Sequence, residues 1–258
     1  TTMCFDHRAR PPIAPIAGGA TDARDLTLTS ADGTKFMAYA ARATNPTGAG
    51  MVVLPDVRGL HQYYKELVLR FAENGVDAIA LDYFGRTDSS NDRGESFDWM
   101  PHVMQTKDAQ VQADVAATVA HLRSAEGGNV RALFSVGFCF GGALSFNQAA
   151  SGLGYAGVIG FYGWPLGLPI PEVDRPRPID SAAQYKAAVL AIYGEADQGI
   201  PPDAIQQFDA ALDAAGVEHE THSYANAPHS FFDRQQEQFA EASADSWERV
   251  KAFIAKHT

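Results

Sequence analysis

The sequence predicts an α/β protein with a mostly parallel central sheet, an antiparallel N-terminal hairpin at one edge and helices on both faces. Short continuous apolar runs alternate with helical patterns from residue 51 onward, which indicates βαβ units and a sheet buried on both faces. Two alternating segments come before them and flank an Asp-Gly turn, which is a hairpin signal. With 258 residues, 46% of them hydrophobic, the chain is long enough to bury one full core.

The elements follow from the N-terminus in order. Residues 1–24 are expected to form an extended arm because 10–19 is rich in Pro and Gly, and 25–258 to form a single domain. The hairpin is predicted at 25–30 and 35–40. The buried-strand candidates are 51–54, 77–81, 131–136, 157–161, 188–193 and 218–224, and the helix candidates are 63–73, 110–123, 142–150, 203–215 and 235–256. A long polar loop to about 106 and a Pro-rich loop from Pro165 to Pro178 complete the prediction.

Composition excludes several classes of protein. The net charge of −11 argues against nucleic acid and against an anionic membrane surface as partners. No apolar run approaches the roughly 18 residues of a membrane-spanning helix, and no secretory signal is expected at the N-terminus. The two cysteines, Cys4 and Cys139, are too few for a disulfide framework, so a reducing cytoplasm is the expected compartment. His219 and His222 lack further ligands at metal-binding spacing, and no metal is expected.

Cys139 is the candidate nucleophile. The strand 131–136 runs into Gly-Phe-Cys-Phe-Gly-Gly at 137–142 and then into a helix. Small residues around a sharp strand-to-helix turn can present one side chain at a helix N-terminus, where a thiolate is stabilised and the next amide can face an oxyanion. The alternative is a buried structural cysteine. A dinucleotide fingerprint needs Gly where this motif has Cys, and no Ser lies in a G-x-S-x-G turn.

A thiol nucleophile needs a base and a group that orients it. His229 lies in Asn-Ala-Pro-His-Ser-Phe after the last predicted strand, and is better placed than the other seven histidines. Asp197 follows the strand 188–193 and would share the carboxyl edge of the sheet with Cys139 and His229. Glu195 is a nearby competitor, and an Asp in such a turn is often only a turn former. The chain order nucleophile, acid, base is that of the α/β-hydrolase fold.

With these motifs the chain resembles the dienelactone hydrolase (carboxymethylenebutenolidase) family, a cysteine-dependent branch of the α/β-hydrolases. GFCFGG, GEADQGIP and APHSFFDR carry the resemblance, which extends from about Asp25 to Ile254. It implies a Cys139–His229–Asp197 triad that hydrolyses a small lactone or ester through a cysteine thioester, without a cofactor.

The resemblance also assigns the loop Leu54–Gly59. In the family this loop holds a Glu that contacts the resting thiol, and the residue after it donates an oxyanion amide. Here those positions are Asp56, one methylene shorter, and Val57, which would act together with the amide of Phe140.

Family members that act on dienelactone hold its carboxylate with two arginines. The resemblance offers Arg86 or Arg93 for one and Arg234 for the other, although each could be an ordinary surface Arg. The spacing from His229 to Arg234 is one residue longer than expected and Asp233 adjoins it, so we expect only a weak preference for carboxylate substrates. Trp99 could line the pocket.

The sequence therefore predicts a hydrolase of a small ester or lactone. A promiscuous esterase on neutral esters and a non-catalytic binding protein on the same scaffold remain alternatives. The expected partner is the small-molecule substrate alone, and the expected state is a monomer or a weak homo-oligomer.

Overall fold

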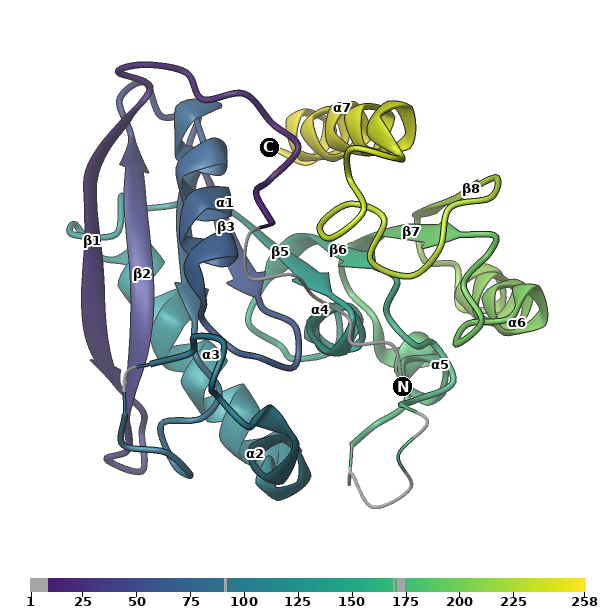
Figure 1. Cartoon of the computed structure of the whole chain (residues 1–258), viewed down its shortest axis with the longest axis horizontal. Helices are drawn as coiled ribbons and strands as arrows, with labels where there is room; N and C mark the ends of the chain where they lie inside the picture. Colours follow the sequence, from purple (N-terminus) through teal and green to yellow (C-terminus); the bar gives the residue numbers. More distant parts are fainter. Residues whose placement is uncertain (1–8, 91, 169, 171–174) are drawn as a thin grey trace.

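The computed structural model describes residues 9–90, 92–168, 170 and 175–258. Cys4, Pro169 and Pro171 lie outside these residues. The described part of the chain forms one eight-stranded sheet (Figure 1). Its strands are β1 (Ala20–Thr29), β2 (Lys35–Ala43), β3 (Ala49–Leu54), β4 (Asp77–Leu81), β5 (Ala132–Phe138), β6 (Tyr155–Phe161), β7 (Ala188–Gly194) and β8 (His219–Tyr224). They lie side by side in the order β1-β2-β4-β3-β5-β6-β7-β8.

The predicted N-terminal hairpin is present at one edge of the sheet. β1 pairs with β2 antiparallel, with Leu26 opposite Ala38, and β2 pairs antiparallel with β4. Gly33 takes the positive φ of 84° that the turn requires, and its N–H donates to the carbonyl of Ser30. β1 begins at Ala20, so it includes the last residues of the expected arm.

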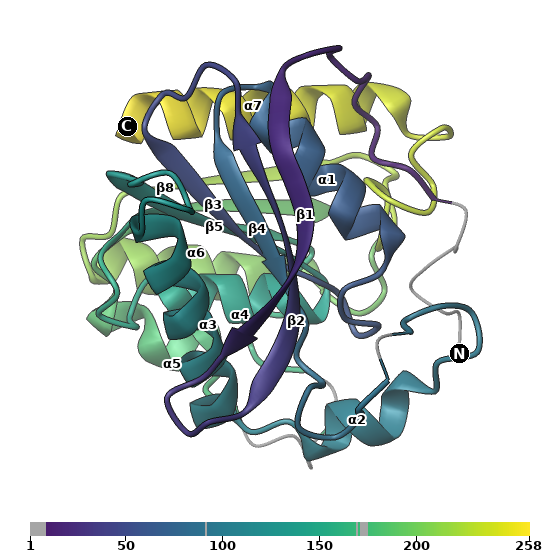
Figure 2. The same cartoon turned by 90° about the vertical axis from the view of Figure 1, so that its left-hand side faces the viewer.

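All remaining strand pairs are parallel, and helices cover both faces of the sheet (Figure 2). The helices are α1 (Gln62–Glu73), α2 (Trp99–Gln105), α3 (Asp108–Arg123), α4 (Phe140–Gln148), α5 (Pro178–Ser181), α6 (Pro202–Ala214) and α7 (Ala240–His257), with a 3₁₀ turn at Ala182–Gln184. Helices α1 and α7 pack on one face, and α3 and α4 lie on the other. None of the described helices combines the length and the apolarity needed to cross a membrane.

Two short helices lie where only loops are predicted. α2 interrupts the long polar loop, and α5 begins within the Pro-rich loop. Pro101 and Pro178 occupy the first turns of these helices, where a missing N–H costs no helical hydrogen bond. α7 begins at Ala240 rather than at residue 235, because residues 230–239 form successive turns.

The topology places one set of strand ends together. Strands β3, β5, β6 and β7 are buried along most of their length and form the centre of the core. Because they are parallel neighbours, their carboxyl ends meet at one edge of the sheet. The loops that leave this edge contain Asp56, Cys139, Tyr162 and Asp197.

Candidate active site

Cys139 occupies a strained turn between β5 and α4. Its backbone has φ 57° and ψ −116°, a conformation that residues with a side chain rarely adopt. The N–H of Cys139 donates to the carbonyl of Phe161 at 3.0 Å, which ties the turn to the end of β6. Only 1% of the residue is exposed, so the thiol is buried at this turn rather than standing at the surface.

Three glycines make this turn possible. A Cβ on Gly137 would lie 1.9 Å from the carbonyl oxygen of Gly141, and one on Gly142 would lie 2.7 Å from that of Phe161. A Cβ on Gly141 would lie 2.1 Å from the carbonyl oxygen of Leu54. The spacing G-x-C-x-G-G is therefore a packing requirement of the turn between β5, β6 and the loop after β3.

His229 and Asp197 form a short hydrogen bond. The Nδ1 of His229 lies 2.6 Å from Oδ2 of Asp197, and the N–H of Gly199 donates to Oδ1 of the same carboxylate at 2.8 Å. Asp197 is 5% exposed, whereas Glu195 points to solvent. A buried carboxylate on Nδ1 fixes the ring so that Nε2 is the atom available for chemistry.

Tyr162 connects the histidine to the cysteine turn. Its ring centroid lies 4.8 Å from that of His229, and Trp164 lies at 4.9 Å from the same ring. Burial raises the pKa of Tyr162 well above its usual range, and the nearby charges of Asp233 and Cys139 add to this effect. Tyr162 directly follows Phe161, whose carbonyl accepts the N–H of Cys139, so the tyrosine in contact with His229 is next in sequence to a residue that is hydrogen-bonded to the cysteine turn.

The loop after His229 packs on the strand ends beside Cys139. The ring of Phe232 lies 4.6 Å from that of Phe161 and 6.0 Å from that of Phe138. Ser230, next to His229, has a positive φ of 62°, as do Tyr162 at 40° and Cys139 at 57°. Strained backbone of this kind is typical of functional sites.

Asp56 is buried and paired with Arg58. Nη2 of Arg58 lies 3.0 Å from Oδ2, the N–H of Arg58 donates to Oδ1 at 2.9 Å, and Nε2 of His61 lies 3.8 Å from Oδ2. Burial on its own would raise the pKa of Asp56, but the Arg58 guanidinium and His61 hold it below its usual range. Arg58 and His61 are thus partners of Asp56, and its expected contact with the Cys139 thiol stays a prediction. Arg58 was not identified from the sequence, although it lies only two positions after Asp56.

Val57 lies on a loop that contacts the start of α4. The carbonyls of Leu54 and Pro55 are packed against Gly141, the residue after Phe140. Tyr83 fixes this loop, because its hydroxyl donates to the carbonyl of Pro55 at 2.9 Å. The fold thus brings the segments of the two expected oxyanion donors, Val57 and Phe140, together.

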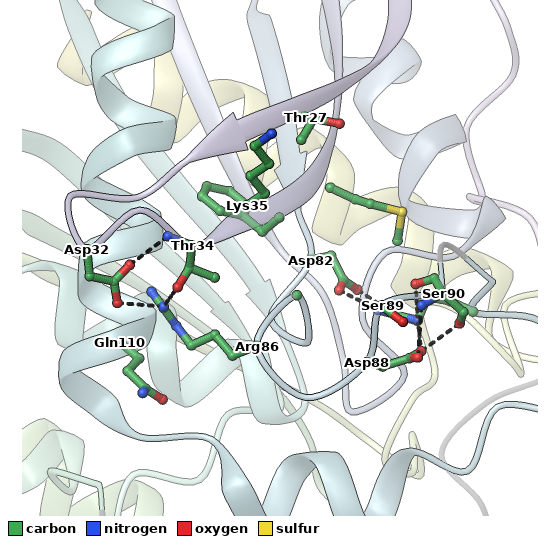
Figure 3. A pocket seen from close by; sticks show the side chains of 14 residues that line it. Thr27, Asp32, Thr34, Lys35, Asp82, Arg86, Asp88, Ser89, Ser90 and Gln110 are labelled. Carbon is green, nitrogen blue, oxygen red and sulfur yellow. Dashed lines mark hydrogen bonds and ion pairs between the residues drawn. The ribbon is translucent and has the colours of Figure 1, made fainter.

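Arg86 is engaged by two carboxylates. Its guanidinium lies 2.6 Å from Asp32 and 2.7 Å from Asp114, and it also contacts Thr34. Figure 3 shows Arg86 pointing towards Asp32 and Thr34 in a polar cavity of about 770 Å³ beside the N-terminal hairpin.

Arg93 likewise forms ion pairs with two carboxylates of the protein. Its guanidinium lies 2.9 Å from Asp82 and 2.7 Å from Asp88, and only 3% of the residue is exposed. It also stacks on the ring of Phe97 at 4.5 Å. Arg86 and Arg93 thus both hold carboxylates of the protein.

Arg234 and Trp99 lie in other surroundings. Arg234 is half-buried in a cavity of about 490 Å³ with Arg10 and Asp233, and its N–H donates to the Asp233 carboxylate. Trp99 is the first residue of α2 and packs on the hydrophobic core. Among the described residues, no group of three or more His, Cys, Asp and Glu side chains is placed to hold a metal ion.

Asp233 is a buried carboxyl group near the site. Burial, together with the negative charge of Asp56, raises its pKa to about 8, although the backbone N–H of Arg234 and the charges of Arg58 and His229 act in the opposite direction. Between pH 4 and 8 the folded protein therefore holds a proton here that the unfolded chain has released. The stabilisation from this proton is complete below about pH 4 and is lost as the pH rises towards 8.

Asp233→Asn should consequently flatten the pH dependence of stability. From pH 5 to 7.5, we expect the free energy of unfolding of the unsubstituted protein to fall more steeply than that of Asp233→Asn. The difference between the two slopes should be up to about 1.4 kcal/mol per pH unit. Urea unfolding at several pH values measures the slope, with the exposed Asp213→Asn as control. An unchanged slope in Asp233→Asn would show that Asp233 is ionised in the folded protein at neutral pH.

Fold and site together define an ester hydrolase of the α/β-hydrolase class. The eight-stranded order, the turn at Cys139 and the His229–Asp197 pair at one sheet edge are the features of that class. A sequence model of the Dienelactone hydrolase family matches residues 36–258. The chain belongs to this family, and it is an ester or lactone hydrolase.

Similar proteins share nearly the whole length of the chain. A Salmonella typhimurium protein with the provisional name carboxymethylenebutenolidase is 30% identical over 258 residues, covering 96% of this chain and 94% of its own. The carboxymethylenebutenolidase of Rhodococcus opacus is 29% identical over 260 residues, covering 99% and 97%. The crystal structure of a provisionally named dienelactone hydrolase from Klebsiella pneumoniae has a TM-score of 0.77 at 28% identity, covering 91% of this chain and 99% of that one.

Proposed function

We propose that this hydrolase cleaves a small ester or lactone through a thioester on Cys139, with His229 as base and Asp197 as its orienting acid. The observation that carries the proposal is the strained turn of Cys139 at the same sheet edge as the 2.6 Å His229–Asp197 hydrogen bond. The contact of His229 with Tyr162, and the hydrogen bond from the Cys139 N–H to Phe161, the residue before Tyr162, support this assignment.

In the first half-reaction, His229 takes the thiol proton and the Cys139 sulfur attacks the substrate carbonyl carbon. The amides of Phe140 and Val57 donate to the oxyanion that forms. The tetrahedral intermediate collapses, the carbon–oxygen ester bond breaks, and the leaving alkoxide takes the proton from His229. The acid fragment remains on sulfur as a thioester.

In the second half-reaction, water replaces the alcohol. His229 accepts a proton from water, whose oxygen attacks the thioester carbonyl with the same two amides on the oxyanion. The carbon–sulfur bond breaks, and the proton returns to sulfur as the carboxylic acid leaves. The carboxylate of Asp197, which is hydrogen-bonded to Nδ1 of His229, stabilises the imidazolium of each step.

A burst experiment tests the covalent route. With excess 4-nitrophenyl acetate, we expect rapid release of about one equivalent of nitrophenol followed by slower turnover. Rapid quenching and peptide mass spectrometry should locate the acetyl group on Cys139. A binding protein on this scaffold would release no burst, and an acetyl group on another residue would replace Cys139 as nucleophile.

The acid can be assigned by a matched pair of variants. Asp197→Asn removes a charge-assisted hydrogen bond worth about 1.5–3 kcal/mol, so kcat/KM should fall by about 10- to 150-fold. Glu195→Gln changes an exposed side chain two residues away and should have little effect. Steady-state hydrolysis of the nitrophenyl ester measures both. A larger loss in Glu195→Gln than in Asp197→Asn would make Glu195 the acid.

A further inference from the structure

The loop after β3 leaves one backbone N–H without an acceptor among the described residues. Five of the six backbone N–H groups in residues 56–61 donate to acceptors within the protein, namely those of Asp56, Arg58, Gly59, Leu60 and His61. The sixth belongs to Val57, which is buried, and no described residue accepts it. Because buried N–H groups are rarely left unpaired, this amide is suited to receive an oxygen of the substrate.

Asp82 holds this loop from the neighbouring strand. It directly follows β4, which pairs with β3, and it is fully buried. Its Oδ1 accepts the N–H of Leu60 at 3.0 Å, and its Oδ2 accepts the N–H of Phe84 at 2.9 Å. Gly59 packs so closely on this carboxylate that a Cβ would lie 2.3 Å from Oδ1. The backbone that follows Val57 is therefore fixed against the end of β4.

Arg93 fixes the carboxylate of Asp82 in turn. Its Nε lies 3.0 Å from Oδ1 and its Nη2 lies 2.9 Å from Oδ2, and both side chains are almost fully buried. Nη1 of Arg93 lies 2.7 Å from Asp88, and Figure 3 shows Asp82 and Asp88 at the same end of the polar cavity. Two backbone N–H groups and two guanidinium N–H groups thus fill the acceptor positions of Asp82, and the bidentate contact fixes its direction.

We propose that Asp82 and Arg93 are positioning residues for ester hydrolysis, because together they hold the N–H of Val57 where the oxyanion forms. The inference rests on the proposed function, in which this amide acts with that of Phe140. The pair acts through the backbone at Leu60 and needs no contact with the substrate. A displacement of about 1 Å in a catalytic group can cost about 10²-fold in rate. The effect belongs to the transition state, where the oxyanion exists, and leaves substrate binding nearly unchanged.

The burst with 4-nitrophenyl acetate measures this effect. Asp82→Asn keeps the size of the side chain and removes its charge, so the burst rate constant should fall about 10- to 100-fold. The substrate concentration that half-saturates the burst should stay within about threefold. Arg93→Lys keeps the charge without the bidentate contact and should lose less. Asp114→Asn is the matched control, because Asp114 is also buried but bonds to Ser30 and Arg86, and it should stay within about twofold.

A thionoester separates positioning from a general loss of stability. In this ester sulfur replaces the carbonyl oxygen, and sulfur is a weak hydrogen-bond acceptor that gains little from the Val57 amide. Asp82→Asn should therefore slow the oxygen ester more than the thionoester, and reduce the ratio of their burst rate constants about tenfold. Asp114→Asn should keep the ratio. Equal losses for the two esters, or no loss in Asp82→Asn, would overturn the inference.

Hydrogen exchange tests the loop without chemistry at Cys139. Exchange in peptides that span residues 56–61 should be faster in Asp82→Asn than in the unsubstituted protein or in Asp114→Asn. Unchanged exchange, or faster exchange with full activity, would also overturn the inference. If Asp82→Asn does not fold, Arg93→Lys carries the same measurements. An acetyl group found on a residue other than Cys139 would overturn the proposed function, while the comparison of the two esters would still decide this inference.

Discussion

Replacing Cys139 by alanine is expected to lower kcat by about 10⁴-fold or more, because the substitution removes the atom that forms the covalent intermediate. The loss should be the same for acidic and neutral esters, since both need the thioester. Hydrolysis of 4-nitrophenyl esters, followed over hours at high enzyme concentration, measures the residual rate.

Two controls keep this result interpretable. Cys139 is 1% exposed and belongs to the hydrophobic core, so the substitution costs some stability, which we expect to stay below about 2 kcal/mol. Thermal unfolding of Cys139→Ala checks that the fold is retained. Cys4 lies outside the described residues, and Cys4→Ala should hydrolyse esters at the full rate. Turnover retained in a folded Cys139→Ala protein would contradict the proposal that Cys139 is the nucleophile.

Removing the base should have the next largest effect. His229→Ala is expected to lower kcat/KM by about 10²–10⁴-fold, as loss of a general base does. Both half-reactions depend on this ring, so the burst and the steady state should slow together. Stopped-flow measurement of the burst and of the later linear phase tests each step separately.

An imidazole rescue experiment distinguishes catalysis from structure. The ring of His229 packs against Tyr162 and Trp164, so we expect His229→Ala to leave a space that added imidazole can enter. Partial recovery with imidazole, and none in a Cys139→Ala background, is the expected pattern. His121→Ala on α3 is the control and should keep its activity. A His229→Ala protein within tenfold of the original rate would exclude His229 as the base.

The sequence predicted the architecture well because burial on both faces leaves a strong pattern. The predicted strand at 77–81 has the same bounds as β4. The predicted strand at 188–193 begins where β7 begins and stops one residue short of its end. Two short helices were not predicted because their local sequence indicates loops. α2 and α5 have prolines in their first turns. A proline followed by a helix of only four to seven residues is easily taken for part of a loop.

At the candidate active site, sequence motifs located the candidate catalytic residues but did not reveal which charged side chains form ion pairs. Cys139 and His229 lie in short segments whose geometry follows from neighbours in sequence. Arg86 pairs with Asp32 and Asp114 of distant segments, which no local pattern encodes. Arg93 and Asp56 pair with Asp82 and Arg58 within their own loops, but the spacing alone did not show that these side chains meet.

The strand order also governs how the chain folds. β3 lies between β4 and β5, so Val53 pairs beside Val136, about 80 residues further along the chain. The hairpin of β1 and β2 can form locally, whereas this central parallel pair must close a long loop before its contacts are gained. Cys139 directly follows β5, and Gly141 packs on the end of β3. The turn that carries the proposed nucleophile is therefore set only when this non-local strand pairing is complete, and a nascent chain that still lacks β5 carries β3 with one unpaired edge.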